Sequence, residues 1–191
     1  MYIYVHKQKR ILIYFAQFLL KNCYFYLWQS NLFQEVKMKL VKADKSDLET
    51  ILQMQTEAFM PMLQKYRDYE TSPANEKYED ILFRFNQPQT TYYIIEVDSH
   101  KVGVIRIVDF DDESMRKRIS PIFIMPEYRN RGYAQQAIAE AERLHGSTNW
   151  SLDTILQEQG NCYLYEKLGY KKTGKTEIIN DRLTLVFYEK D

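Results

Sequence analysis

Two arginines and an asparagine stand directly before a glycine where a predicted strand becomes a helix. The order is Arg129, Asn130, Arg131 and Gly132, with Ala134 inside the helix. A helix N-terminus binds anions, because its first N–H groups are unpaired and its dipole end is positive. Gly132 lets an oxygen approach the backbone, and the arginines add directed donors for phosphate. The pattern predicts a pyrophosphate cradle; a solvated arginine pair beside a packing glycine is the alternative.

Strands and helices alternate around this junction. Apolar periodicity predicts strands at 38–43, 91–97, 101–110, 116–125, 149–156, 170–179 and 182–189. Helices are expected after Asp44, with Asp47 as reciprocal cap; after Ser72, with Pro73 at the first position; after Gly132, with the apolar face Ala134, Ala137, Ile138, Ala141 and Leu144; and at 161–168. This order predicts an α+β fold with one parallel crossover through the alanine-rich helix.

A second motif lies downstream of the glycine junction. The run "LYEKLGY" occupies residues 164–170, and Arg129-x-x-Gly132-x-Ala134 follows an apolar strand before it. This pair of motifs resembles those of the GNAT superfamily of N-acetyltransferases, and the resemblance covers residues 38–191. It implies a mixed, mostly antiparallel sheet flanked by helices, with a splayed cleft for acetyl-CoA, the co-substrate.

The resemblance also implies roles for single residues. Ile122, Phe123 and Ile124 would lend backbone groups to the pantetheine arm and the thioester carbonyl. The pyrophosphate would bind to the turn made of Arg129, Asn130, Arg131, Gly132, Tyr133 and Ala134. Tyr165 would protonate the leaving thiolate; simple packing of its ring against the sheet is the alternative. Many members carry a coenzyme-binding asparagine seven residues before this tyrosine, but here Glu158 stands there and Asn161 is the candidate substitute.

The acceptor side is suggested by a loop rich in aromatic and acidic residues. Tyr66, Tyr69 and Glu70 fall where the family shapes its acceptor pocket, although an ordinary polar loop would look the same. Such a loop can hold an ammonium group by charge and cation–π contact, so we expect a small-molecule or peptide amine as acceptor. A carboxylate can take the proton of that amine. The candidates are Glu57, Asp109 and Glu158, each of which is also typical of a plain surface carboxylate.

Composition argues against several other functions. Twenty-six basic residues balance 26 acidic ones, which is not the charge of a nucleic-acid binder. Cys23 and Cys162 form no C-x-x-C motif, which fits a reducing cytoplasm, and the scattered histidines predict no metal site. No Ser/His/Asp or Cys/His set is present, in agreement with direct transfer without a protein nucleophile. We expect a cytoplasmic monomer or homodimer.

The first 37 residues differ from the rest of the chain. They contain no Gly, Pro or Asp and are rich in residues that AT-rich DNA encodes, and codons for Gln34 to Lys37 can form a ribosome-binding site. We therefore predict a mis-assigned start, with a native protein from Met38 that has no membrane contact. A membrane anchor at 11–28 and a signal peptide are the alternatives. Lys21 and Asn22 interrupt the former, and the latter lacks a small-x-small cleavage site.

Together these patterns predict an acetyl-CoA-dependent N-acetyltransferase that acetylates a primary amine directly. Two other functions stay open. One is a sensor of the same fold that binds acetyl-CoA without turnover. The other is a membrane-attached interaction protein held by residues 11–28. The sequence does not identify the acceptor.

Overall fold

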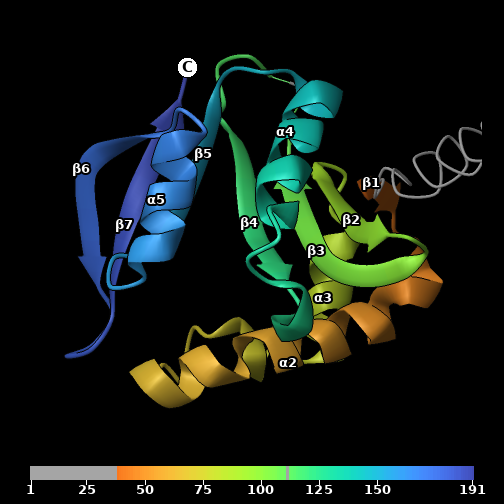
Figure 1. Ribbon diagram of the computed structural model, residues 1–191, viewed down its shortest axis with the longest axis horizontal. Helices are drawn as coiled ribbons and strands as arrows, with labels where there is room; N and C mark the ends of the chain where they lie inside the picture. The colour runs from red at the N-terminus through yellow and green to blue at the C-terminus, as the bar shows by residue number, and fades with distance from the viewer. Residues whose placement is uncertain (1–37, 111) are drawn as a thin grey trace, which may run out of the picture. The chain divides into compact units, whose positions relative to one another are not determined.

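The protein is built on one sheet, described by a computed structural model that covers residues 38–110 and 112–191. In this part of the chain, seven strands lie in the order β1-β2-β3-β4-β5-β7-β6 (Figure 1). Their bounds are β1 Met38–Lys42, β2 Thr90–Val97, β3 His100–Val108, β4 Lys117–Ile124, β5 Trp150–Ile155, β6 Lys171–Ile178 and β7 Thr184–Lys190. Among these strands of the described residues, only β4 and β5 pair in parallel. The expected mostly antiparallel α+β sheet with one parallel crossover is confirmed.

Helices cover both faces of the sheet. They are α2 (Leu48–Tyr66), α3 (Tyr78–Phe85), α4 (Tyr133–His145) and α5 (Gln159–Lys167), with short 3₁₀ turns η1 (Lys45–Asp47), η2 (Pro73–Asn75) and η3 (Pro126–Tyr128). Ile51 of α2 and Ile81 of α3 share a core with Ile94 of β2. The next residue on that strand, Ile95, packs in a second core with Ile138 of α4. Neighbouring strand residues point to opposite faces, so α2 and α3 lie on one side and α4 and α5 on the other (Figure 1).

The predicted cap before α2 is confirmed. The Asp44 carboxylate accepts from the N–H of Ser46 at 2.7 Å, and the N–H of Asp44 donates to Asp47 at 3.1 Å. This reciprocal pair opens η1, which leads directly into α2. Pairing of this kind satisfies two of the N–H groups that every helix start leaves unbonded.

Two local predictions need correction. Ser72 caps only the short turn η2, because the chain becomes extended at Glu76 and α3 begins at Tyr78. The Glu76 carboxylate pairs with Arg84 and accepts from Gln55. These contacts hold Glu76 in the extended segment between η2 and α3. In α4, Leu144 is 45% exposed and does not belong to the buried face.

Our expectations for residues 1–37, whether leader, signal peptide or membrane anchor, concern a segment outside the described residues. Within the described ranges, no helix combines the length and apolar character needed to cross a membrane. The same ranges hold no group of His, Cys, Asp and Glu side chains suited to a metal ion.

Candidate active site

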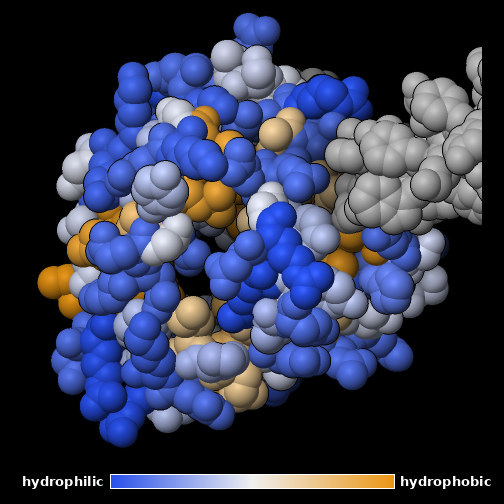
Figure 2. Space-filling view, in the orientation of Figure 1, coloured by the Kyte–Doolittle hydropathy of each residue, from blue (hydrophilic) through white to orange (hydrophobic). Residues whose placement is uncertain are grey.

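The strands β4 and β5 pair only at their first residues. Lys117 pairs with Trp150 and Arg118 with Ser151, and the ladder ends there although β4 continues to Ile124. The two strands therefore separate toward their carboxyl ends. Figure 2 shows the surface hollowed between α5 and α4, where the separation lies. This is the splayed cleft that the resemblance implies.

One edge of β4 presents its backbone to this cleft. Phe123 pairs with β3, and the N–H of Met125 donates to β3 at 2.8 Å. Along an antiparallel strand, successive residues direct their backbone groups to alternate sides. The N–H and C=O of Ile122 and Ile124 therefore point away from β3, toward the side of β5. The C=O of Ile124 accepts from Arg129 Nε at 3.0 Å, which leaves its N–H and both groups of Ile122 facing the cleft.

The turn between β4 and α4 ends in two residues with left-handed backbone. Asn130 has φ 60° and Gly132 has φ 80°, and Gly132 is the N-terminal cap of α4. No side chain of the described residues caps this helix start. A Cβ at Gly132 would have only Gln136 Nε2 nearby, at 3.9 Å. The first-turn N–H groups of α4 are thus open to an approaching anion.

The two arginines of this turn are engaged with the backbone. Arg129 donates through Nε to Ile124 O and through Nη2 to Ala58 O at 2.9 Å, so it ties the turn to both β4 and α2. Arg131 donates to Glu127 O at 3.0 Å, lies over the ring of Tyr128 and is exposed. Arg129 therefore fixes the shape of the turn, whereas Arg131 presents charge beside it.

Tyr165 lies in α5 with its ring inside the core. The side chain is 6% exposed, and its ring contacts those of Tyr170 and Tyr188 at centroid distances of 6.2 and 6.0 Å. Burial raises the pKa of the phenol well above its usual range, and the negative charge of Asp153 adds to the effect. The phenol therefore keeps its proton at neutral pH.

Glu158 and Asn161 contact different parts of the molecule. Asn161 is exposed and directs its amide to Thr154 Oγ1 of β5 at 3.4 Å. Glu158, the N-cap residue of α5, accepts from Lys65 Nζ and Tyr66 Oη at 2.6 Å each. Glu158 thus faces the end of α2. The involvement of Lys65 was not predicted from the sequence.

The aromatic and acidic side chains of the loop after α2 differ in their exposure and contacts. Tyr66 is buried, whereas Tyr69 is 66% exposed and Glu70 is also exposed. The Asp68 carboxylate is occupied by the N–H and hydroxyl of Thr71, at 2.9 and 2.7 Å. Of these side chains, only Tyr66 reaches a carboxylate of another element.

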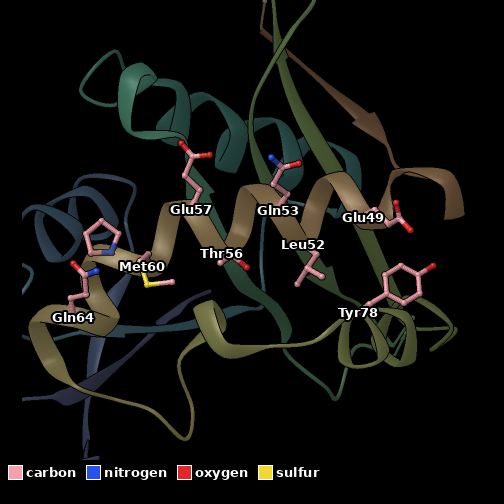
Figure 3. A pocket seen from close by; sticks show the side chains of 9 residues that line it. Glu49, Leu52, Gln53, Thr56, Glu57, Met60, Gln64 and Tyr78 are labelled. Carbon is pink, nitrogen blue, oxygen red and sulfur yellow. The ribbon is translucent and has the colours of Figure 1, made fainter.

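The other candidate bases lie elsewhere. Glu57 borders a groove of about 870 Å³ along the solvent side of α2, where it and Gln53 extend to one side and Leu52 to the other (Figure 3). The Asp109 carboxylate lies 3.0 Å from Nδ1 of His145, at the far end of α4. That helix of 13 residues separates Asp109 from the Gly132 turn by about 20 Å. Geometry therefore argues against Asp109 as the base.

This chain matches a protein-family model. The acetyltransferase (GNAT) family model matches residues 49–170, well over half of the chain. The chain belongs to the GNAT acetyltransferase family, whose members transfer the acetyl group of acetyl-CoA. The protein is therefore an acyltransferase with acetyl-CoA as its co-substrate.

Solved structures agree on the fold. A spermidine N-acetyltransferase from Vibrio cholerae, in complex with CoA and spermine, has a TM-score of 0.63 and 16% identity, covering 79% of this chain and 93% of its own. A PaiA N-acetyltransferase from Thermoplasma acidophilum, in complex with coenzyme A, gives 0.61 and 18%, covering 81% and 99%. An acetyltransferase from Salmonella typhimurium that modifies the N-terminal serine of ribosomal protein L7/L12 gives 0.59 and 15%, covering 81% and 94%. No match was found among curated proteins.

Proposed function

We propose that the protein transfers an acetyl group directly from acetyl-CoA to a primary amine of a small molecule or peptide. The observation that carries this proposal is the separation of β4 from β5 beside the uncapped N-terminus of α4. In the proposal, backbone groups of Ile122 and Ile124 bind the pantetheine arm and the thioester carbonyl. The pyrophosphate binds at the turn from Arg129 to Ala134, and Asn161 contacts the coenzyme from α5.

Direct transfer requires two proton movements. The amine nitrogen attacks the thioester carbonyl carbon, the C–S bond breaks, and an amide and the free thiol of CoA are formed. A primary amine with a pKa of about 10 must first lose a proton, which passes through water to a carboxylate or to solvent. The N–H groups of β4 that face the cleft stabilise the negative charge that develops on the carbonyl oxygen.

Tyr165 supplies the second proton in this proposal. Its raised pKa keeps the hydroxyl protonated over the working range. Burial likewise raises the pKa of a thiol, so a thiolate leaving group beside the Tyr165 hydroxyl would hold a proton more strongly than it does in water. Packing of the ring against Tyr170 and Tyr188 is compatible with this role, because it holds the hydroxyl in one place.

The acceptor is bound from the side of α2 in this proposal. Tyr66, Tyr69 and Glu70 lie at the end of α2 and in the loop after it, and the relatives named above act on spermidine in one case and on the N-terminal serine of a ribosomal protein in another. Both acceptors are amines, which supports an amine here. We place the reaction in the cytoplasm, as the cysteine pattern suggests.

A screen of amines tests the proposal. The protein is incubated with acetyl-CoA and a panel of monoamines, polyamines, amino acids and short peptides, and the release of CoA thiol is followed. Acetylated product, identified by mass spectrometry and greatly reduced in Tyr165→Phe, is the expected result. Tight acetyl-CoA binding in calorimetry without thiol release for any amine of the panel would overturn the proposed amine acceptor.

A further inference from the structure

A lysine of the protein itself sits in a site suited to an ammonium ion. Lys65 Nζ lies 2.6 Å from Glu158 Oε1 and 4.9 Å from the centre of the Tyr66 ring. Tyr66 Oη donates to the same carboxylate oxygen at 2.6 Å. A carboxylate beside an aromatic face is the arrangement that binds primary ammonium groups by charge and cation–π attraction.

Three segments far apart in the sequence build this site. Lys65 and Tyr66 end α2, Glu158 precedes α5, and Asn180 in the β6–β7 turn donates to Tyr66 O at 3.1 Å. The Asn180 bond fixes the backbone of Tyr66 from a third direction. The ring and the carboxylate are therefore held by the fold, and only Lys65 is free to leave.

The two partners of the ion pair differ in how exposed they are to solvent. The Lys65 side chain is 58% exposed, whereas the Glu158 side chain is 21% exposed. A long exposed lysine gains little from such a pair, because ordering its side chain opposes the attraction. An incoming ammonium group can therefore displace Lys65 and take over both contacts.

We propose that Glu158 and Tyr66 form a subsite for a second cationic group of the acceptor, which Lys65 occupies until the acceptor binds. This inference rests on the proposed function and narrows its substrate class to amines that carry another positive charge, such as diamines and polyamines. Lys65 acts as an internal substitute for that charge.

Spacing along α5 explains why the subsite holds a second charge and not the reacting nitrogen. Glu158 is the N-cap residue of α5 and Tyr165 stands seven residues further on, so the two are about 10 Å apart along the helix axis. If Tyr165 is beside the thioester sulfur, a group bound at Glu158 is too distant to react. Burial acts to raise the pKa of Glu158, but hydrogen bonds from Lys65 and Tyr66 outweigh it and keep the pKa below its usual range. The carboxylate is thus ionised at neutral pH and is a poor base.

A matched pair of acceptors tests the subsite. Cadaverine and n-pentylamine have the same carbon chain and differ in the second amine. The wild-type protein should prefer cadaverine in kcat/KM, and Glu158→Gln should reduce kcat/KM for cadaverine about tenfold or more while n-pentylamine and the KM of acetyl-CoA change little. Glu79 is an exposed carboxylate on α3, so Glu79→Gln is the control and should leave kcat/KM unchanged for both amines.

A second variant separates this role from a structural ion pair. Lys65→Met removes the internal occupant and should lower the KM for cadaverine several-fold, opposite in sign to Glu158→Gln. If both variants impair cadaverine, or if neither changes its preference over n-pentylamine, the subsite is refuted.

Binding measurements keep this outcome distinct from failure of the proposed function. If no amine is acetylated at all, the proposed function fails. The subsite still predicts that cadaverine raises the melting temperature more than n-pentylamine does, and that Glu158→Gln abolishes the difference. Equal shifts for the two amines would refute it.

Discussion

The hydroxyl of Tyr170 donates to the carboxylate of Glu142 at 2.9 Å, within the core that joins α4 to the C-terminal strands. Lys190 Nζ of β7 approaches the second oxygen of the same carboxylate at 2.7 Å. Lys190 also pairs with Trp150, at the end of the sheet where β4 and β5 are still joined. These contacts hold the two halves of the sheet together at the end from which the cleft opens.

Removing this carboxylate should destabilise the protein. Glu142→Ala leaves the Lys190 ammonium and the Tyr170 hydroxyl without their partner, in a site where the Glu142 side chain is only 10% exposed. The loss of one partner from a buried pair costs about 3–5 kcal/mol, and urea unfolding measures it. Glu140→Ala is the control, since Glu140 pairs with the exposed Arg143 and should cost less than about 1 kcal/mol. Equal losses in the two variants would contradict the argument.

Gly132→Asp should weaken acetyl-CoA binding by more than about tenfold, or about 1.4 kcal/mol. The new carboxylate would stand beside the open N–H groups of α4 and repel a pyrophosphate. Calorimetry with acetyl-CoA measures the change. Gly174→Asp controls for backbone strain, because Gly174 also has positive φ, at 85°, but lies on exposed β6. An unchanged affinity in folded Gly132→Asp would refute the cradle.

Tyr165→Phe should lower kcat about 100-fold with little change in coenzyme affinity, since it removes the proton donor and keeps the ring. Rapid-mixing kinetics under conditions where chemistry limits the rate provides the measurement. Tyr163→Phe, on the same helix but 68% exposed, should leave kcat unchanged. A wild-type kcat in Tyr165→Phe would assign Tyr165 to packing alone.

Burial of Tyr165 should also make the stability of the protein fall with rising pH in the alkaline range. Its pKa is raised in the folded protein, so the unfolded chain releases the proton first, at about pH 10. The contribution of Tyr165 to stability is therefore complete below about pH 10 and is lost as pH rises further. Urea midpoints above this pH should fall more steeply for the wild type than for Tyr165→Phe. Parallel slopes in the two proteins would contradict the buried phenol.

The order of strands and helices and the Asp44–Asp47 cap could be predicted, because both depend on residues close together in the sequence. The contact between Tyr66 and Glu158 could not, since it joins residues 92 apart with no local pattern to mark it. The use of Arg129 was hidden for the same reason, as its acceptor Ala58 lies on another element. Glu142 was missed because the apolar period of α4 marks only residues such as Ala137 and Ile138 as buried, whereas the partners of Glu142, Tyr170 and Lys190, lie far away in the sequence.

Gly103 sets the position of the strand that borders the cleft. It pairs with Ile124 across β3 and β4, and a Cβ there would lie 2.3 Å from Phe123 O and 2.9 Å from Ile124 Cδ1. Because Phe123 O is backbone, relief requires β4 to move away from β3. Gly103→Ala should therefore cost about 1–3 kcal/mol in stability and also weaken acetyl-CoA binding, since the cleft-facing groups of Ile124 move with the strand. Chemical unfolding and calorimetry measure both effects.

Gly160→Ala is the control, because a Cβ at Gly160 meets no atom within 4 Å. Loss of stability with full coenzyme affinity would show that this edge of β4 does not bind the coenzyme.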